Sequence, residues 1–119
     1  MSISTTSFWT LSVLASGPHH GYGILKSITE LSNATVDVRV GALYRTIDRL
    51  ESDGLIEIDH RETVDGRERT YYRLTPKGHS ELESTLNEMQ MMTSVAESRL
   101  RNTNLGKLGI RPSTMGLLL

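Results

Sequence analysis

Residues 40–56 restrict the fold of this chain more than any other stretch. Apolar residues recur there at steps of three and four, which places them on one side of a helix that must be buried: Val40, Leu43, Ile47 and Leu50. Arg45 and Arg49 fall on another side, four residues apart. Gly54 then supplies a left-handed helix stop. The pattern predicts an amphipathic helix with a basic, exposed side.

Two shorter helical patterns precede this stretch. Thr5 or Thr6 is expected to cap the first helix, which runs to about residue 16. Its inner side is predicted to carry Phe8, Leu11, Leu14 and Ala15. Residues 19–21 form a connector to a second helix of about ten residues. Its inner side is predicted to carry Tyr22, Leu25, Ile28 and Leu31. Two short helices before a third with exposed arginines are typical of a helix-turn-helix.

Two strand patterns follow the third helix. Residues 55–60 alternate between apolar and polar side chains, which is the period of a half-buried strand. Residues 70–74 are rich in strand-forming types. Asp65-Gly66 between them favours a tight reversal. The sequence predicts a fold that is mainly α with a small β-hairpin (α+β), a winged helix-turn-helix whose hairpin carries arginines near its tip.

A long helix is expected to start at Thr75-Pro76, because threonine caps helix N-termini and proline suits the first helical position. It is predicted to run to about residue 101, and about 26 residues extend roughly 39 Å. Steps of four and three alternate along it: Leu82, Leu86, Met89, Thr93, Ala96 and Leu100. A small three-helix domain cannot cover such a length. The simplest partner is the same helix of a second copy, in a twofold dimer.

The chain is expected to divide into three segments. Residues 1–74 form a winged helix-turn-helix domain and residues 75–101 a C-terminal dimerisation helix. Residues 102–119 form a tail that the pattern leaves unplaced. Leu105, Leu108 and Ile110 would let the tail fold back over the dimer surface, and a loosely ordered tail is the alternative.

Composition excludes several classes of function. The net charge of −1 is too small for a protein that coats nucleic acid by bulk attraction, so any such contact must be local. Seven arginines do cluster between residues 39 and 73. The chain has no cysteine, and the adjacent His19 and His20 have no further ligand close in sequence. Without a catalytic motif or a long apolar run, we expect a cytoplasmic protein that is not an enzyme and holds no metal or cofactor.

Four motifs make the chain resemble the PadR family of bacterial and archaeal transcriptional regulators. They occupy residues 17–24, 41–51, 54–56 and 66–75, and the resemblance covers residues 8–101. It implies a winged-helix homodimer that binds an inverted-repeat operator in double-stranded DNA. It also implies that the dimer represses a neighbouring gene until a small molecule or a stress signal releases it.

Three positions depart from the family pattern. Gly23 stands where the family commonly has an acidic residue, and Arg45 where it often has proline. The arginine would therefore add a contact peculiar to this chain. Some short members hold flat aromatic drugs between their C-terminal helices with a tryptophan there. The only tryptophan here is Trp9, which argues against a pocket of that kind.

Eight residues are candidates for contact with DNA: Tyr22, Gly41, Ala42, Tyr44, Arg45, Arg49, Arg67 and Arg69. In a twofold dimer the two copies of the third helix would enter successive major grooves about 34 Å apart. Arg45 and Arg49 would there read guanine edges or grip phosphates. The alternative is a solvated helix side whose arginines pair with neighbouring acids, namely Asp48, Glu51 or Asp53.

Alternatives also remain for the other candidates. Tyr22 would meet a phosphate at the start of the second helix, or pack as a core aromatic. Tyr44 is expected to be structural, wedged between helix and wing. Arg67 would enter the minor groove or follow the DNA backbone, or be an ordinary hairpin charge. Met89 and Met92 would line an adaptable effector cavity between dimer helices, although core packing is the simpler interpretation.

Two functions remain open on these observations. The first is a sequence-specific, effector-responsive transcriptional repressor. The second is a winged helix that serves protein association without sequence-specific DNA binding, with the hairpin and the long helix forming an assembly scaffold.

Overall fold

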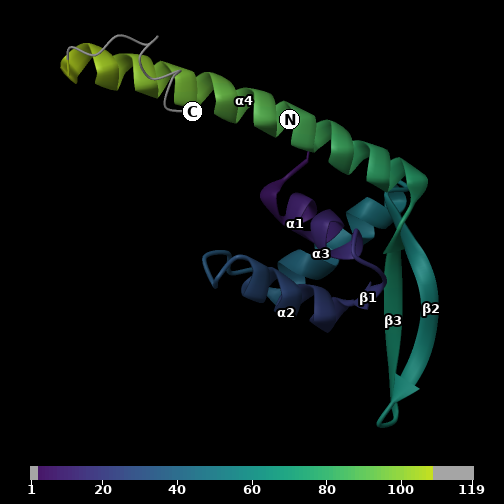
Figure 1. Cartoon of the computed structure of the whole chain (residues 1–119). Helices are drawn as coiled ribbons and strands as arrows, with labels where there is room; N and C mark the ends of the chain where they lie inside the picture. The colour runs from purple at the N-terminus through teal and green to yellow at the C-terminus, as the bar shows by residue number, and fades with distance from the viewer. Residues whose placement is uncertain (1–2, 109–119) are drawn as a thin grey trace. The chain divides into compact units, whose positions relative to one another are not determined.

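The computed structural model describes residues 3–108, and the side chains of residues 3–103. The chain divides into one unit up to Thr85 and a second unit from Leu86 onward. The elements follow one another as shown in Figure 1: α1 (Thr5–Leu14), β1 (His19–His20), α2 (Gly21–Leu31), α3 (Val40–Ser52), β2 (Ile56–Val64), β3 (Arg67–Leu74) and α4 (Pro76–Leu108). No helix in this range combines the length and apolar character needed to cross a membrane.

Helix α1 begins one residue earlier and ends sooner than the sequence pattern suggests. The predicted caps Thr5 and Thr6 are wrong, because Ser4 has the extended backbone of a cap and its hydroxyl accepts the Ser7 N–H at 3.1 Å. Leu11 and Leu14 are buried as predicted. Ala15 is exposed because the helix has already ended at Leu14, and Phe8 is only partly buried.

Helix α2 confirms only part of its predicted inner side, since Ile28 is buried and Leu25 half-buried as expected. Ile24 and Ile28 are fully buried, whereas Tyr22 and Leu31 are 68% and 64% exposed. The predicted core positions of Tyr22 and Leu31 are therefore wrong. Both lie near the ends of this 11-residue helix, and their side chains are open to solvent.

Helix α3 matches its prediction except at its first residue. Leu43, Ile47 and Leu50 are each at most 2% exposed, but Val40 is 56% exposed. Val40 lies on the predicted side by angle, yet it occupies the first helical position, beyond the end of the core. The helix ends as predicted, with Gly54 at a φ of +74°.

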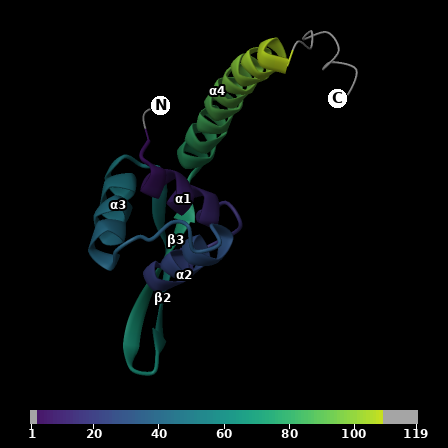
Figure 2. The same ribbon diagram turned by 90° about the vertical axis from the view of Figure 1, so that its left-hand side faces the viewer.

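The sheet contains one strand more than predicted. Its order is β1-β3-β2, with both pairs antiparallel. The predicted connector at His19 and His20 is strand β1, which pairs with Tyr72 and Tyr71 of β3. The hairpin of β2 and β3 is also longer than residues 55–60 and 70–74, and its turn at Asp65-Gly66 has positive φ at both positions. Figure 2 shows the hairpin tip reaching past the three short helices.

One apolar core joins the helices, the base of the hairpin and the first turns of α4. Its buried members are Leu11, Val13, Leu14, Ile24, Ile28, Leu43, Ile47, Leu50, Leu55, Ile56 and Leu82. As predicted, Thr75 caps α4, since its hydroxyl oxygen accepts the Gly78 N–H at 3.0 Å. Leu82 is 8% exposed, so this residue of the predicted dimer seam belongs to the core of its own chain.

Helix α4 continues to Leu108 rather than ending near residue 101. In the second unit its apolar side chains are open: Leu86, Met91, Met92, Val95 and Leu100 are 41% to 64% exposed. Of the remaining seam residues, Met89 is half-buried, and Thr93 and Ala96 are exposed. Residues 102–108, predicted to be part of the tail, are helical, and residues 109–119 lie outside the described range, Ile110 among them.

Candidate nucleic-acid interface

Helix α3 presents two exposed arginines that have no partner among the described residues. Arg45 and Arg49 are both exposed, and neither side chain makes a hydrogen bond or ion pair with the part of the chain that the structure describes. The Arg45 guanidinium lies along the helix surface, with Nη1 only 3.5 Å from where a Cβ on Gly41 would be. The predicted pairing of these arginines with Asp48, Glu51 or Asp53 is absent from the structure. Both guanidinium groups are therefore available to a ligand.

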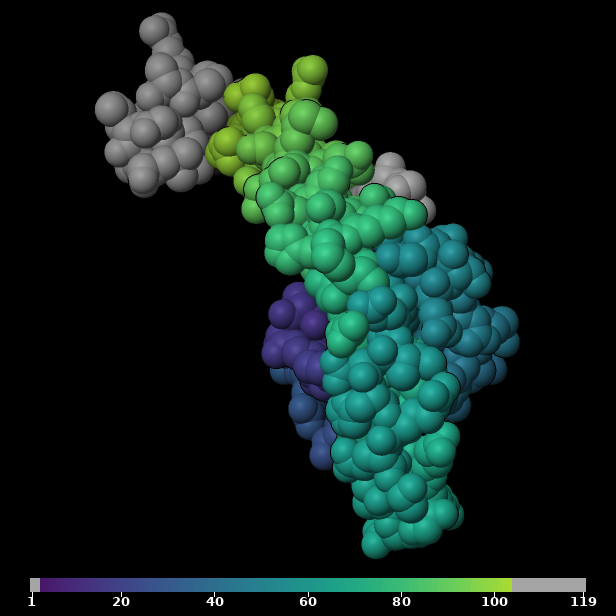
Figure 3. Space-filling model, turned by 90° about the vertical axis from the view of Figure 1, so that its right-hand side faces the viewer, coloured from purple at the N-terminus to yellow at the C-terminus, as the bar shows by residue number. Residues whose placement is uncertain are grey.

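The hairpin carries four arginines, of which Arg73 and Arg61 form ion pairs within the described part of the chain and Arg67 and Arg69 do not. At the base, Arg73 Nη2 lies 2.9 Å from Glu57 Oε1 and Arg73 Nη1 lies 3.3 Å from Asp59 Oδ1. These two carboxylates raise the pKa of Arg73. Arg67 and Arg69 are exposed and have no such partner among the described residues. Figure 3 shows the outer face of the hairpin, in teal, extending to this tip.

The start of α2 exposes an aromatic side chain beside a helix N-terminus. Tyr22 is 68% exposed, so it is not a core aromatic. His20 caps the helix, because its Nδ1 accepts the Gly23 N–H at 3.1 Å. The His20 ring lies 6.5 Å from the Tyr22 ring and nearly parallel to it. Backbone N–H groups in a first helical turn lack helical partners, so this end of α2 favours an anion.

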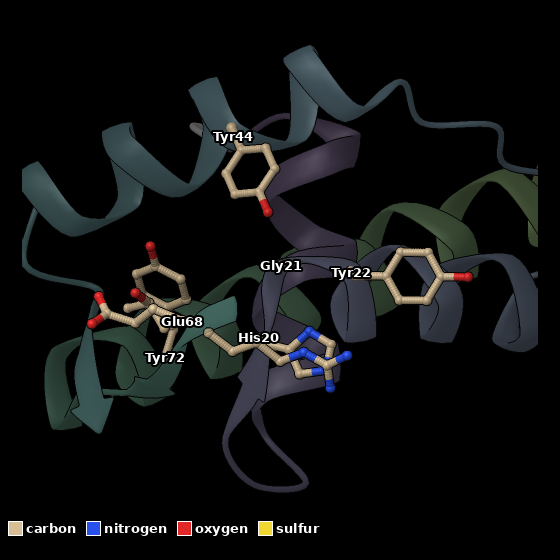
Figure 4. A pocket seen from close by; sticks show the side chains of 8 residues that line it. His20, Gly21, Tyr22, Tyr44, Glu68 and Tyr72 are labelled. Atoms are coloured by element: carbon tan, nitrogen blue, oxygen red, sulfur yellow. The ribbon is translucent and has the colours of Figure 1, made fainter. Parts of the chain in front are cut away.

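Tyr44 lies between α3, α2 and the hairpin. Its side chain is 45% exposed, and its hydroxyl points toward Gly21 at the first position of α2 (Figure 4). The space beside it is a pocket of about 230 Å³, lined by His20, Gly21, Tyr22, Tyr44, Glu68, Arg69, Thr70 and Tyr72. Burial, followed by the charges of Glu51 and Asp48, raises the pKa of the Tyr72 hydroxyl. Tyr44, which was predicted to lie between α3 and the hairpin, thus contacts α2 as well.

The eight predicted DNA-contact residues fall into three groups. Gly41, Arg45 and Arg49 are exposed along α3, while Ala42 is half-buried and its carbonyl accepts the Thr46 hydroxyl at 3.0 Å. The pocket brings together Tyr22, Tyr44 and Arg69. Arg67 stands apart, next to the turn at Asp65-Gly66.

Sequence reasoning missed the roles of both histidines near Tyr71. His20 lies edge-on to the Tyr71 ring with a centroid distance of 5.1 Å, and His60 stacks on it at 4.3 Å. His60 Nδ1 also lies 2.5 Å from Asp59 Oδ2, and the hydrogen bonds that the ring donates to Asp59 and then to Glu62 raise the pKa of His60. Burial, then Arg69, lowers the pKa of His20. Only the pairing of distant strands reveals these neighbours. Within residues 3–108, no three His, Asp or Glu side chains gather as a metal site would require.

A family model and a curated relative match this chain. The model of the transcriptional regulator PadR-like family matches residues 10–84. The chain is 47% identical over 53 residues to the transcriptional regulator Rv3488 of Mycobacterium tuberculosis, which covers 44% of this chain and 49% of that protein. The chain thus spans about half the length of this curated relative.

Solved structures share the fold. A PadR family transcription regulator from Clostridium difficile superposes with a TM-score of 0.72 at 26% identity, covering 82% of this chain and 99% of that one. Bacillus subtilis PadR, solved in complex with operator DNA, gives a TM-score of 0.64 at 20% identity, covering 87% of this chain and 69% of that one. The second likeness is one of fold alone.

Proposed function

We propose that this chain, which belongs to the PadR-like family of transcriptional regulators, binds a specific operator in double-stranded DNA as a homodimer. Members of this family are transcriptional regulators, not enzymes. In the proposed role the dimer represses a nearby gene in the cytoplasm, and a small molecule or a stress signal releases it.

The observation that carries the proposal is that Arg45 and Arg49 on α3 are exposed and make no hydrogen bond or ion pair within the part of the chain that the structure describes. The opposite side of this helix, with Leu43, Ile47 and Leu50, is locked in the core, so the arginines project from a fixed support. A guanidinium donates two parallel hydrogen bonds to O6 and N7 of guanine in the major groove. Arg45 and Arg49 are therefore proposed to read bases or grip phosphates from that groove.

The rest of the interface would contact the DNA backbone. Arg67 and Arg69 extend along a hairpin whose tip passes the helices, which suits phosphates or the minor groove. Tyr22 and the first turn of α2 would meet another phosphate. Bacillus subtilis PadR, which has a similar fold, has been solved with operator DNA, and this supports operator binding as the proposed role here.

Dimerisation would supply a second copy of α3 to contact the second half of the operator. The open apolar side chains of α4, including Leu86 and Leu100, are proposed to pack on the same helix of a second copy. The two α3 helices would then read half-sites about 34 Å apart in an inverted repeat. Met89 and Met92 of the same helix are proposed to line an adaptable contact for the effector.

A mobility-shift titration tests this function. The wild type should bind a duplex from its own promoter region more tightly than a scrambled duplex, at each of two salt concentrations. Replacing both Arg45 and Arg49 by alanine should weaken operator binding by at least about tenfold, because each base contact is worth about 1–3 kcal/mol. Equal, weak binding to both duplexes by the wild type would contradict sequence specificity.

A matched variant controls for the loss of positive charge. Arg73→Ala also removes an arginine, but one that Glu57 and Asp59 already neutralise, so operator affinity should stay within about twofold. If the double variant on α3 binds like the wild type, the assignment of α3 is wrong. A dimer that binds no duplex would instead favour the protein-association function.

A further inference from the structure

We infer that Tyr44 is a positioning residue: its ring packs on the bare backbone of Gly21 and thereby fixes where α3 holds Arg45. The inference rests on the proposed function, and it assigns Tyr44 a task that needs no contact with DNA. Gly21 is the second residue of this contact, because the Tyr44 ring can pack there only against a residue without a side chain.

The distances show why Gly21 must be glycine. A Cβ at this position would lie 2.5 Å from the Tyr44 Oη, 2.8 Å from Cζ and 2.9 Å from Cε1. These separations are well below ordinary van der Waals contact for carbon. Gly21 is buried, and Figure 4 shows the Tyr44 ring directed at it from α3. The ring and the helix backbone thus touch without any intervening side chain.

Gly21 is itself held firmly. The residue before it, His20, pairs with Tyr71 in the sheet and also caps α2 through its Nδ1. The backbone at residue 21 is therefore fixed by a strand on one side and by a helix cap on the other. A rigid ring packed on this point restrains the element that carries the ring, which is α3.

The contact complements the restraint that the core already provides. Leu43 and Ile47 hold the buried side of α3, whereas Tyr44 is 45% exposed and lies on the outer rim. Helix α3 is thus held from two directions, and rotation about its own axis is limited. Arg45 directly follows Tyr44, so any displacement of the ring's backbone moves this guanidinium with it.

The exposed ring contributes positioning more than stability. The Tyr44 hydroxyl makes no hydrogen bond with a described residue, and nearly half of the side chain stays in solvent. A methyl group at position 21 would force either α3 or the ring to move. In both cases Arg45 loses its fixed position, which should lower affinity for the operator more than affinity for other DNA.

A double-mutant cycle tests the inference. Operator affinity is measured by fluorescence anisotropy for the wild type, Gly21→Ala, Tyr44→Ala and the double variant. Gly21→Ala should weaken operator binding on the order of tenfold in the wild type but by less than about twofold in the Tyr44→Ala background. Binding of a scrambled duplex should change by less than about twofold, because phosphate contacts tolerate a displaced helix.

Gly23→Ala is the matched control on the same helix. A Cβ there would lie 3.5 Å from the nearest atoms of the His20 ring, which is ordinary contact. Because no atom of Tyr44 is near this position, whatever Gly23→Ala costs in operator affinity should be the same in the wild-type and Tyr44→Ala backgrounds. The inference is overturned if Gly21→Ala binds the operator normally, or costs the same in both backgrounds.

Thermal unfolding of the same variants, without DNA, separates this inference from the proposed function. Tyr44→Ala should relieve most of the destabilisation that Gly21→Ala causes, since the clash disappears with the ring. A wild type that does not prefer its operator would refute the proposed function. An unfolding cycle without coupling would refute the packing of Tyr44 on Gly21.

Discussion

Helices α3 and α4 both carry large apolar side chains, but these side chains differ in what covers them. The apolar side of α3 is closed within its own chain, with Leu43, Ile47 and Leu50 nearly inaccessible. Beyond Thr85, α4 leaves large apolar side chains such as Leu86 and Leu100 open to solvent. The difference teaches that a helical repeat predicts an apolar side, and that only the surrounding elements decide whether that side is core or interface.

The largest effect is expected when charge is placed on the predicted dimer seam of α4. Replacing Leu86 and Leu100 together by glutamate should convert the proposed dimer to monomers, because buried unpaired charges are costly. Sedimentation velocity at micromolar concentration would report the mass. Met91→Glu is the control, since Met91 is as exposed as Leu100 but lies off the predicted seam. A double variant that stays dimeric would remove the seam assignment.

Removing a buried apolar side chain from α3 should instead destabilise the fold of each chain. Ile47 is fully buried, so Ile47→Ala should lower the free energy of unfolding by about 2–5 kcal/mol. Val40→Ala, on the same helix but 56% exposed, should change it by less than about 0.5 kcal/mol. Urea denaturation measures both variants. Similar losses at both positions would contradict the observed end of the core.

The exposed sides of α3 and of the hairpin should contribute to binding in different ways. Arg45→Ala should cost about 1–3 kcal/mol of operator affinity and relax specificity at one base position. Arg67→Ala should weaken binding of all duplexes similarly and reduce the slope of affinity against salt by about one. Anisotropy titrations over a salt series distinguish the two patterns. An unchanged salt slope for Arg67→Ala would make this arginine an ordinary hairpin charge.

The smallest expected effect is on the pH dependence of the melting temperature, through His60 of the hairpin. Asp59 raises the pKa of His60, so the stabilisation from His60 is fully present below its ordinary pKa of about 6.5 and is lost as pH rises through the folded value. His60→Gln should therefore lower the melting temperature more at about pH 5.5 than at about pH 8. The pair is exposed, so the shift should be small. Equal shifts at both values would exclude this linkage.

The sequence predicted best those features that local backbone chemistry controls. The Thr75 cap, the left-handed Gly54 and the turn at Asp65-Gly66 all stand as expected. Periodicity failed at Val40 and Leu31 because it gives the angle of a side chain but not the presence of a neighbour at its height. It failed at Tyr22 because this residue lies on the side of α2 opposite Ile24 and Ile28. All three mispredicted residues lie at or near a helix end.

Features that depend on distant segments were beyond sequence reasoning. Strand β1 has only two residues and exists because it pairs with β3, more than fifty positions later. The polar part of the hairpin lacks alternation, so its full length was missed. For the candidate site, the exposed arginines of α3 were foreseeable from spacing, whereas the packing of Tyr44 on Gly21 requires the tertiary structure.

The junction between α3 and α4 allows no change in chain length. The Thr75 hydroxyl donates to the Gly54 carbonyl at 2.6 Å, Lys77 Nζ donates to the Asp53 carbonyl at 2.8 Å, and a Cβ on Gly78 would overlap the Leu55 carbonyl. An inserted residue on either side would break this fit between the first turn of α4 and the backbone that follows α3. The hairpin turn has open space around Gly66, so insertions and natural length variation should be tolerated there instead.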